Sequence, residues 1–383
     1  MNNRKIKIVH IINELSPGGA EKMLLNLVLH SDKSRFDISV FSLQTKGEFA
    51  VEIEDLGIPV FSFYFYKKYN FIFKFLKLML MLIKIKPDIV HTWMYHSNLI
   101  GGIATKLVTS SKVMWSIHST TLETGAEKKG TVLAIKLSAF LSKVLPDKII
   151  FCSRVSYNFH ETIGYNKDRM LIIPNGIDLG EFKYSNKGKL NLINKLKLEH
   201  DTKFIGMVGR YHPMKRHDIF LHAAQIFVSK YPSVHFILCG SQVDHSNEKL
   251  AKLINLFDLS SNLHLLGYIS DMANIYASLD ILAVTSSYGE SFPLTICEAM
   301  ACKVPVTATN VGDASYIINN KDMIIPINEP ILLANKWKKI ISLDQKSRNE
   351  IGDRNRSRIK ELFDIKIIEK NYSYFYKQLL NLT

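Results

Sequence analysis

Short apolar segments typical of strands alternate with helix patterns along this chain, and the alternation runs twice. The first series opens at 5–12 with KIKIVHII, a continuous β-prone run that suits a strand buried on both faces of a parallel sheet. A stretch rich in turn formers and charges, 174–189, interrupts the pattern before it starts again at 204. Because strands that alternate with helices form parallel sheets, the sequence predicts two doubly wound α/β domains.

These patterns locate the expected elements. The predicted strands are 5–12, 36–43, 60–65, 89–93, 113–117 and 148–152, then 204–208, 234–238, 263–266, 281–285, 304–308 and 323–325. The predicted helices are 20–30, 48–56, 71–84, 99–107 and 132–145, then 218–230, 247–257, 272–278 and 293–301, with a mostly helical tail over 329–382. Ligands of open α/β sheets bind at the carboxyl ends of the strands, so we expect the site in a cleft between the two domains.

The composition favours two folded domains with an acidic partner. At about 150 residues per domain, 383 residues make two domains, and 47% hydrophobic with 22% charged residues excludes a disordered or fibrous chain. Lysine and arginine outnumber aspartate and glutamate by 49 to 35, which favours nucleic acid, an anionic membrane or a phosphorylated small molecule as partner. The four cysteines form no CxxC pair and have no zinc-site spacing, which favours a reduced, cytosolic setting. No signal-peptide pattern precedes the first strand.

The most hydrophobic segment is 71–85, FIFKFLKLMLMLIKI. It is too short to span a bilayer, and Lys74, Lys77 and Lys84 interrupt it. On a helical wheel these lysines fall within about 80° of one another. One interpretation is an interfacial helix that inserts apolar groups among lipids and sets its lysines against anionic headgroups. The other is a helix packed on a sheet with its lysines in water, and the sequence leaves both open.

The segment 288–302, YGESFPLTICEAMAC, carries the clearest chemical signal. A helix is expected to start near Pro293 with Ser291 as a possible cap, so that free backbone N–H groups of its first turn form an anion site. Glu298 follows about 1.5 turns into the helix, roughly 7–8 Å along its axis. That offset suits a phosphate at the helix tip and a ribose diol on Glu298, with Glu290 near the group that the phosphate carries. A capped surface helix with ordinary acids is the alternative.

Two cations follow the first strand of the second series, in GMVGRYHPMK at 206–215. Arg210 offers a planar fork and Lys215 a point charge, a combination that suits a diphosphate, although two solvated cations are the alternative. No Asp-x-Asp occurs in the chain, which argues against metal-bridged diphosphate chemistry. Cationic side chains and a helix dipole would then stabilise the leaving group.

The first domain contributes weaker signals. The loop 13–21, NELSPGGAE, lacks the full GxGxxG fingerprint, yet its small residues could approach a phosphate or sugar. His118 follows the predicted strand 113–117. An imidazole at the carboxyl end of a strand fits a functional site, and a purely structural role is the alternative.

At these residues the chain resembles the retaining glycosyltransferases of family 4, which have the two-domain GT-B fold. The resemblance covers almost the whole chain, and its strongest element is the acid pair within ESFPLTICEAMA, 290–301. Supporting motifs are PGGAE at 17–21, PNGID at 174–178, GR at 209–210 with Lys215, and LGYISDM at 266–272. The resemblance implies an acceptor-side domain at 1–180, a nucleotide-sugar-binding domain at 181–360, and a helix at 361–383 that crosses back to the first domain.

The resemblance also implies roles for individual residues toward a nucleotide-sugar donor, UDP- or GDP-linked, with no metal or other cofactor. Glu290 and His118 would act at the sugar as the catalytic residues, and Glu298 would bind the ribose. The remaining donor-binding residues would be Gly18, Gly19, Arg210, Lys215, Ile269, Ser291, Phe292, Pro293, Leu294 and Thr295. In such enzymes the acceptor hydroxyl is thought to attack the sugar from the same face that the leaving group departs from. No side-chain general base is therefore assigned.

The chain departs from the family pattern at three places. Lys303 stands where the family often has glycine, Gly312-Asp313 replaces a Gly-Gly pair, and Tyr316 stands near the usual position of an acid. Because the core of the motif at 290–301 is intact, these departures bear on the sugar pocket more than on the activity.

Family members of this style commonly build surface polysaccharides on lipid-linked intermediates at the inner membrane face. The resemblance therefore implies a cytoplasmic protein, peripheral at that face, with a lipid-linked or other glycan acceptor. Candidate acceptor-side residues are His91, Tyr95 and His96, and candidate membrane-surface residues are Lys74, Lys77 and Lys84. Two alternatives stay open: a GT-B-type nucleotide-sugar epimerase, and a catalytically idle partner protein that binds anionic membranes. Nucleic acid is not expected as a partner, because the basic residues are dispersed and form no recognition module.

Overall fold

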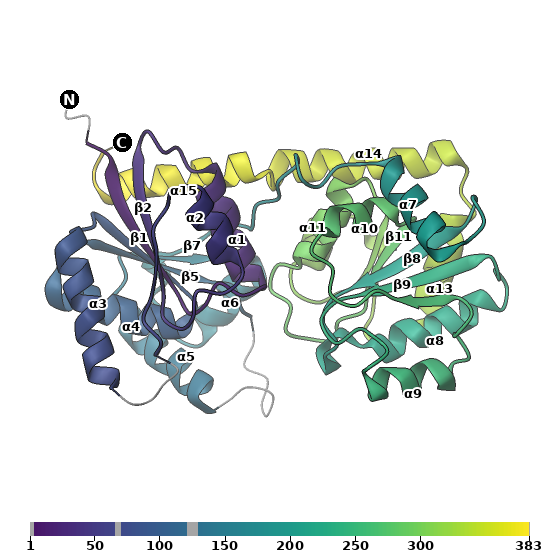
Figure 1. The fold of residues 1–383 in the computed structure, drawn as a ribbon, viewed down its shortest axis with the longest axis horizontal. Coiled ribbons are helices and arrows are strands. Elements are labelled where there is room, and N and C mark those ends of the chain that lie inside the picture. The colour runs from purple at the N-terminus through teal and green to yellow at the C-terminus, as the bar shows by residue number, and fades with distance from the viewer. Residues whose placement is uncertain (1–3, 66–69, 121–128, 383) are drawn as a thin grey trace. The chain divides into compact units, whose positions relative to one another are not determined.

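A computed structural model describes residues 4–65, 70–120 and 129–382 of the chain. It divides into two compact units, each built on a parallel sheet with helices on its faces (Figure 1). Unit 1 is Met1–Gly176 with Ile365–Thr383, and unit 2 is Ile177–Asp364. The predicted doubly wound α/β class is confirmed. The unit boundaries at 176 and 364 compare with the sequence-based boundaries at 180 and 360.

The sheet of unit 1 has seven described strands in the order β3-β2-β1-β4-β5-β6-β7, and all neighbours are parallel. The strands are β1 Ile6–Ile12, β2 Phe36–Ser42, β3 Val60–Ser62, β4 Ile89–Trp93, β5 Lys112–Ile117, β6 Lys148–Phe151 and β7 Met170–Ile172. In chain order, β2 and β3 extend the sheet on one side of β1, and β4 to β7 then extend it on the other side. This topological switch point between β1 and β4 is where open α/β sheets place ligands.

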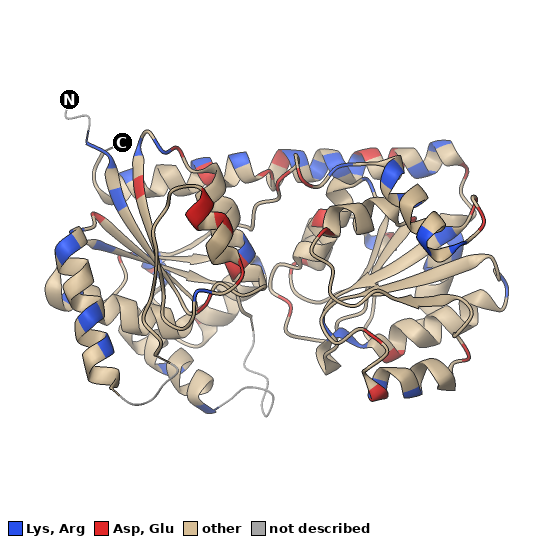
Figure 2. Cartoon of the chain, viewed as in Figure 1, with Lys and Arg blue, Asp and Glu red and all other residues tan. Residues whose placement is uncertain are grey.

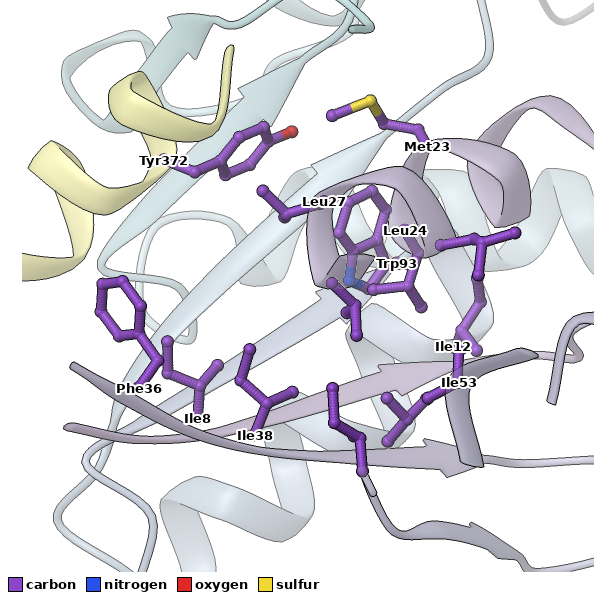
Figure 3. Close-up of a cluster of buried hydrophobic side chains, with 14 of the residues drawn as sticks. Ile8, Ile12, Met23, Leu24, Leu27, Phe36, Ile38, Ile53, Trp93 and Tyr372 are labelled. Carbon is purple, nitrogen blue, oxygen red and sulfur yellow. The ribbon is translucent and has the colours of Figure 1, made fainter. Parts of the chain in front are cut away.

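Alternate residues of β1 face two separate helix layers. Ile8 and Ile12 lie in a core with the helices α1 Gly19–His30, α2 Phe49–Asp55 and α15 Ile365–Leu379. Figure 3 shows this core, with Tyr372 of α15 beside Leu27 of α1. Val9 and Ile11 face the opposite layer, which consists of α3 Phe71–Ile85, α4 Tyr95–Val108 and α5 Lys129–Leu141. The helix α6 Arg154–Thr162 packs near β6 and β7.

The C-terminal helix α15 is part of unit 1. Its residues Ile365, Ile368, Tyr372 and Tyr376 are buried in the core that α1 covers. The Tyr376 hydroxyl lies 2.8 Å from Nδ1 of His91 on the central strand β4. The end of the chain is therefore held to unit 1 by apolar packing and by a buried side-chain hydrogen bond.

The sheet of unit 2 has six described strands in the order β10-β9-β8-β11-β12-β13, again all parallel. The strands are β8 Lys203–Val208, β9 Val234–Cys239, β10 Leu263–Leu265, β11 Ile281–Val284, β12 Val306–Thr309 and β13 Ile324–Ile325. The helices are α7 Asn186–Leu196, α8 His217–Val228, α9 Glu248–Leu256, α10 Met272–Ser278, α11 Leu294–Ala301, α12 Ala314–Ile318, α13 Pro330–Ile341 and α14 Gln345–Leu362. The switch point of this sheet lies between β8 and β11.

The structure adds elements that the sequence patterns did not predict. These are β7, α6, α7 and α12, all of them short. α7 starts inside the predicted linker 174–189, because glycine and asparagine are typical of turns and hid the helical pattern from the sequence analysis. Leu192 and Ile193 of this helix are buried. Within the described residues, no helix has both the length and the apolar character needed to cross a membrane.

Candidate functional site

The loops that follow β8 and β11 meet at the switch point of unit 2. The two strands are neighbours in the sheet, with Ile205 opposite Ile281. Beyond the strands, the Thr285 hydroxyl donates to the carbonyl of Lys215 at 2.7 Å, and the Ser287 N–H donates to the carbonyl of Met214 at 2.8 Å. These bonds hold together the two segments in which the sequence placed its cations and its first glutamate.

Lys215 and Glu290 form an ion pair between these loops. The Lys215 Nζ lies 2.5 Å from Glu290 Oε1, and the two side chains are 15% and 12% exposed. The Ser286 hydroxyl donates to the same oxygen at 2.7 Å. Burial raises the pKa of the Glu290 carboxyl, but the charge and hydrogen bond of Lys215 and the bond from Ser286 outweigh it, so the pKa lies below its ordinary value. Glu290 is therefore an anion at neutral pH.

The backbone path beside this pair requires glycine. Gly240 has φ +152°, and a Cβ there would overlap the carbonyl of Gly209. Gly209 has φ +155°, and a Cβ there would lie 3.2 Å from Cε of Lys215. The loop after β8 thus passes directly over the end of β9, and the Lys215 side chain crosses Gly209.

The two arginines of this loop differ in their surroundings. Arg210 is exposed, and its charge contributes to the low pKa of Glu290. Arg216, which the sequence did not single out, is held by Asp218 through bonds of 2.9 Å from Nε and 2.6 Å from Nη2. Of these two arginines, Arg210 is therefore the one that is exposed to solvent and near Glu290.

Helix α11 begins at Leu294, one residue later than predicted. Its N-cap residue is Pro293, which makes no capping side-chain hydrogen bond, so Ser291 does not occupy the N-cap position. Instead, the Ser291 carbonyl accepts the Asp313 N–H at 3.0 Å. The Ile296 N–H bonds to the Pro293 carbonyl at 3.1 Å, whereas Leu294 and Thr295 lie in the first turn, whose N–H groups have no acceptor within the helix. An anion at this end would meet two N–H groups and the positive end of the helix dipole.

Glu298 lies in the second turn of α11 and accepts a hydrogen bond from Tyr276 of α10. Tyr276 is fully buried; burial and then the charge of Glu298 hold the pKa of its hydroxyl well above its usual value. The sequence analysis did not identify Tyr276, because no motif marks it and only the packing of α10 on α11 brings it to Glu298.

The loop after β10 lies against the same edge of the sheet. The Gly240 N–H donates to the Gly267 carbonyl at 2.8 Å, and the backbone of Ile269 hydrogen bonds to Cys239. A cavity of about 840 Å³ opens beside these loops, between the first turns of α8 and α9. Its lining includes Tyr211 and Arg216 but none of the predicted donor-binding residues.

The predicted residues of unit 1 lie near its own switch point. Gly18 and Gly19 are exposed at the start of α1, where Gly18 is the N-cap. His118 follows β5, and its ring stacks on Trp93 with centroids 5.3 Å apart. Burial lowers the pKa of His118 to about 4, so the ring is neutral at pH 7.

The three acceptor-side candidates have different environments. His91 is completely buried, with Nδ1 2.8 Å from the Tyr376 hydroxyl and Nε2 2.7 Å from the Ser116 hydroxyl. Tyr95 is 3% exposed and its hydroxyl lies 2.9 Å from Nε2 of His160. Of the three, His96 is the one that is exposed. The geometry gives His91 and Tyr95 partners within the protein core.

Among the described residues, no group of three or more His, Cys, Asp or Glu side chains is arranged to hold a metal ion.

One departure from the family pattern, Lys303, lies where the backbone conformation itself favours glycine. Lys303 adopts φ +65°, in the left-handed region that glycine favours, and its ammonium pairs with Asp353 at 2.6 Å.

Known proteins match both halves of the chain. Residues 17–181 match the family model described as Glycosyltransferase Family 4, and residues 189–358 match the model described as Glycosyl transferases group 1. The UDP-Gal:alpha-D-GlcNAc-diphosphoundecaprenol alpha-1,3-galactosyltransferase of Escherichia coli is 25% identical over 304 residues, which are 78% of this chain and 77% of that protein. The capsular polysaccharide biosynthesis glycosyltransferase CapM of Staphylococcus aureus is 28% identical over 316 residues, covering 77% and 79%.

A solved structure matches the fold. The crystal structure of HepE from Anabaena in complex with UDP aligns with a TM-score of 0.84 at 22% identity, over 97% of this chain and 100% of that one.

Proposed function

This chain belongs to glycosyltransferase family 4, with the GT-B fold, and we propose that it moves a sugar from a nucleotide diphosphate to a lipid-linked glycan with retention of configuration and without a metal ion. The observation that carries the proposal is the charge arrangement at the switch point of unit 2. Lys215, Arg210 and the start of α11 supply positive charge around the anion Glu290.

A donor diphosphate fits this arrangement. Arg210 is exposed and can bind a phosphate through its planar fork, while Lys215 supplies a second cation. The N–H groups of Leu294 and Thr295 can receive a phosphate oxygen at the positive end of α11. These groups would stabilise the charge that develops on the leaving nucleotide, the task that a metal ion performs in other transferases.

Glu298 and Glu290 take different parts of the donor in this proposal. Glu298, oriented by Tyr276, accepts hydrogen bonds from the ribose hydroxyls. Glu290 is ionised and paired, so it serves as an acceptor for sugar hydroxyls and as the partner that positions Lys215, not as a proton donor. The donor phosphate takes the acceptor's proton, which suits attack from the face that the phosphate leaves.

Three similar proteins support the choice of donor and acceptor. The Escherichia coli enzyme is named for UDP-Gal and a diphosphoundecaprenol-linked acceptor, and the HepE structure contains UDP. CapM is a glycosyltransferase of capsular polysaccharide biosynthesis. We infer a UDP-linked donor and an acceptor on a lipid diphosphate for the present enzyme.

A lipid-linked acceptor requires access to a membrane. Of the 15 residues of α3, Leu78 and Leu82 are buried, while Ile72 and Phe73 are each 71% exposed. With Lys74, Lys77 and Lys84 beside this apolar surface, α3 has the composition of an interfacial helix. We propose peripheral binding at the cytoplasmic face of the membrane.

The test of the donor site is calorimetry and thermal shift across UDP- and GDP-linked sugars, since a true donor stabilises the folded state. Arg210→Ala and Glu298→Ala are expected to lose binding, whereas Arg354→Ala, which removes an exposed arginine of α14, should keep it. If both site variants bind and transfer as the parent does, the site assignment is wrong. Isomerisation of the donor without acceptor would identify an epimerase, and vesicle binding without donor affinity would identify a catalytically idle protein.

A further inference from the structure

The helix layer α3–α4–α5 of unit 1 contains no acidic residue. It carries six lysines, at positions 74, 77, 84, 106, 129 and 136. The layer on the opposite face of the sheet differs, since α1 carries Glu21 and α2 carries Glu52, Glu54 and Asp55. Figure 2 shows α3 and α5 with blue but no red, and red on α1. The helices on this face of unit 1 therefore carry lysines and no acidic side chain.

Helix α3 exposes an apolar stripe next to a lysine stripe. At 100° per residue, the exposed Ile72, Leu76, Leu80 and Ile83 fall within about 80° of one another on the wheel. Their exposed fractions are 71%, 46%, 65% and 45%. Lys84 and Lys77 follow at the edge of this stripe, about 40–60° beyond Leu80.

Helix α5 and its last turn repeat the same design. Leu133, Phe140 and Val144 are 66%, 71% and 64% exposed, and Leu137 is 42% exposed. At 100° per residue these four side chains fall within about 60° of one another. Lys129, Lys136 and Lys143 form a second stripe directly beside them, within about 40°, and all three are exposed. The opposite side of α5 packs Ala134, Ile135 and Ala139 into the core.

The two helices flank α4 on the same face of the sheet (Figure 1). α4 contacts both, and its Leu107 adds a side chain that is 64% exposed. Lys106 of α4 pairs with Asp147 at 3.1 Å, so the lysines of α3 and α5 carry most of the basic character. Each of the two helices that flank α4 thus carries an apolar stripe with a lysine stripe beside it.

We propose that α3 and α5 together form a docking face for an anionic phospholipid surface, with α5 as an anchor in its own right. The apolar ridges enter the headgroup boundary and the lysines contact lipid phosphates. Charge complementarity favours lipid over a second copy of the chain. A two-fold contact would press these acid-free helices against their own copies and bring lysines together. The inference deepens the proposed function, because it names the surface that would present the lipid-linked acceptor.

The test is flotation with vesicles of phosphatidylcholine and phosphatidylglycerol, compared with phosphatidylcholine alone. The parent is expected to float with the anionic vesicles and to be released by salt. The α5 variant combines Lys136→Glu, Lys143→Glu and Phe140→Ser. Since one lysine near an anionic surface contributes about fivefold, losing two should weaken binding ~25-fold, and the added acids and the lost ring should weaken it further.

A matched control keeps the interpretation specific. Leu256 is 71% exposed on α9 of unit 2, with the exposed Lys252 one turn before it. Leu256→Ser with Lys252→Glu makes the same kinds of change away from the docking face and should float as the parent does. Circular dichroism and the melting temperature of each variant establish that it is folded.

Several outcomes would overturn the inference. These are a parent protein that does not bind anionic vesicles, an α5 variant that floats as well as the parent, or a parent dimer in light scattering that the α5 variant dissociates without losing vesicle binding. Transfer to a water-soluble acceptor is measured in parallel. If it is normal in the α5 variant, a loss of flotation concerns docking alone; if it is absent in the parent, the proposed function fails independently.

Discussion

The ammonium nitrogen of Lys215 lies 2.5 Å from Oε1 of Glu290, a residue 75 positions later in the chain. The pair links the loop after β8 to the loop after β11, where both loops leave neighbouring strands. From the sequence we assigned Lys215 to the donor diphosphate and Glu290 to the donor sugar. The structure shows that each of these residues sets the electrostatic environment of the other.

Removal of one partner is expected to cost stability. Lys215→Met keeps the aliphatic stem over Gly209 but leaves the Glu290 carboxylate buried without its cation. We expect a loss of about 1–3 kcal/mol in the free energy of unfolding at pH 7. Glu290→Gln should cost less, because the amide oxygen can still accept from Ser286. Urea denaturation of both single variants and the double variant measures the coupling, and additive losses would contradict it.

The same variants predict a pH dependence. In the parent, the pKa of Glu290 lies below its ordinary 4.5, so its contribution to stability is present above pH 4.5 and is lost as the pH falls through the folded-state pKa. Without Lys215, only the hydrogen bond from Ser286 and the charge of Arg210 still oppose burial, so the pKa of Glu290 rises relative to the parent. The variant should then gain stability relative to the parent as the pH falls from 7 toward 4. Denaturation at several pH values checks this, and a constant difference would refute it.

Tyr276 is expected to be a positioning residue for Glu298. Tyr276→Phe removes the hydroxyl that hydrogen bonds to the carboxylate while it preserves the packed ring. We expect UDP affinity to fall about tenfold, since a hydrogen bond to a charged group contributes about 1.5 kcal/mol. Calorimetry with UDP measures the effect. Tyr231→Phe in the same unit is the control, and equal affinities for both variants would remove the assigned role.

Gly240 and Gly57 form a matched pair for the backbone argument. Both have positive φ, but a Cβ at Gly240 would overlap the Gly209 carbonyl, whereas a Cβ at Gly57 would meet nothing within 4 Å. Gly57→Ala should cost about 1 kcal/mol from backbone strain alone. Gly240→Ala should cost more and also weaken donor binding, because the loop with Arg210 must shift. Melting temperatures and UDP binding test this, and two variants with equal effects would contradict it.

Unit 1 is expected to lose stability in mild acid. Burial lowers the pKa of His10 to about 3 and the pKa values of His118 and His160 to about 4, from 6.5. The unfolded chain therefore binds more protons below pH 6.5, so stability is fully present above that pH and falls between 6.5 and 4. Each histidine contributes up to about 1.4 kcal/mol per pH unit. His160→Gln should reduce this slope in chemical denaturation from pH 4 to 7; an unchanged slope would show that His160 does not titrate in folding.

The strands and long helices could be predicted because their apolar periodicity is local. The β4 boundaries 89–93 and the α10 boundaries 272–278 agree with the sequence patterns, as does the start of α3 at Phe71. β7 was not predicted; its three residues, Met170–Ile172, lie directly before the predicted linker 174–189. α7 was read as linker because turn formers open it, and only burial of Leu192 and Ile193 against the rest of unit 2 makes it a helix.

The candidate site was predictable residue by residue but not as an arrangement. Arg210, Lys215, Glu290 and Glu298 stand in recognisable motifs, whereas Tyr276 stands in none. The environment of His91 could not be predicted from the sequence either, because its hydrogen-bond partners Tyr376 and Ser116 lie 285 and 25 positions away in the chain. The acceptor-side role of His91 stays a prediction, and its geometry is that of a residue that fastens α15 to β4.

By itself, the sequence determined the parallel α/β class, the family motifs and the excess of positive charge, because each depends on residue type and short-range spacing. The tertiary structure alone decided that Lys215 pairs with Glu290, that Tyr276 supports Glu298, and that the helices α3 and α5, each with a lysine-bordered stripe, flank α4 on one face of the sheet. These relationships join segments that are not neighbours in the chain. Their geometry follows from strand order and helix packing, which local periodicity does not contain.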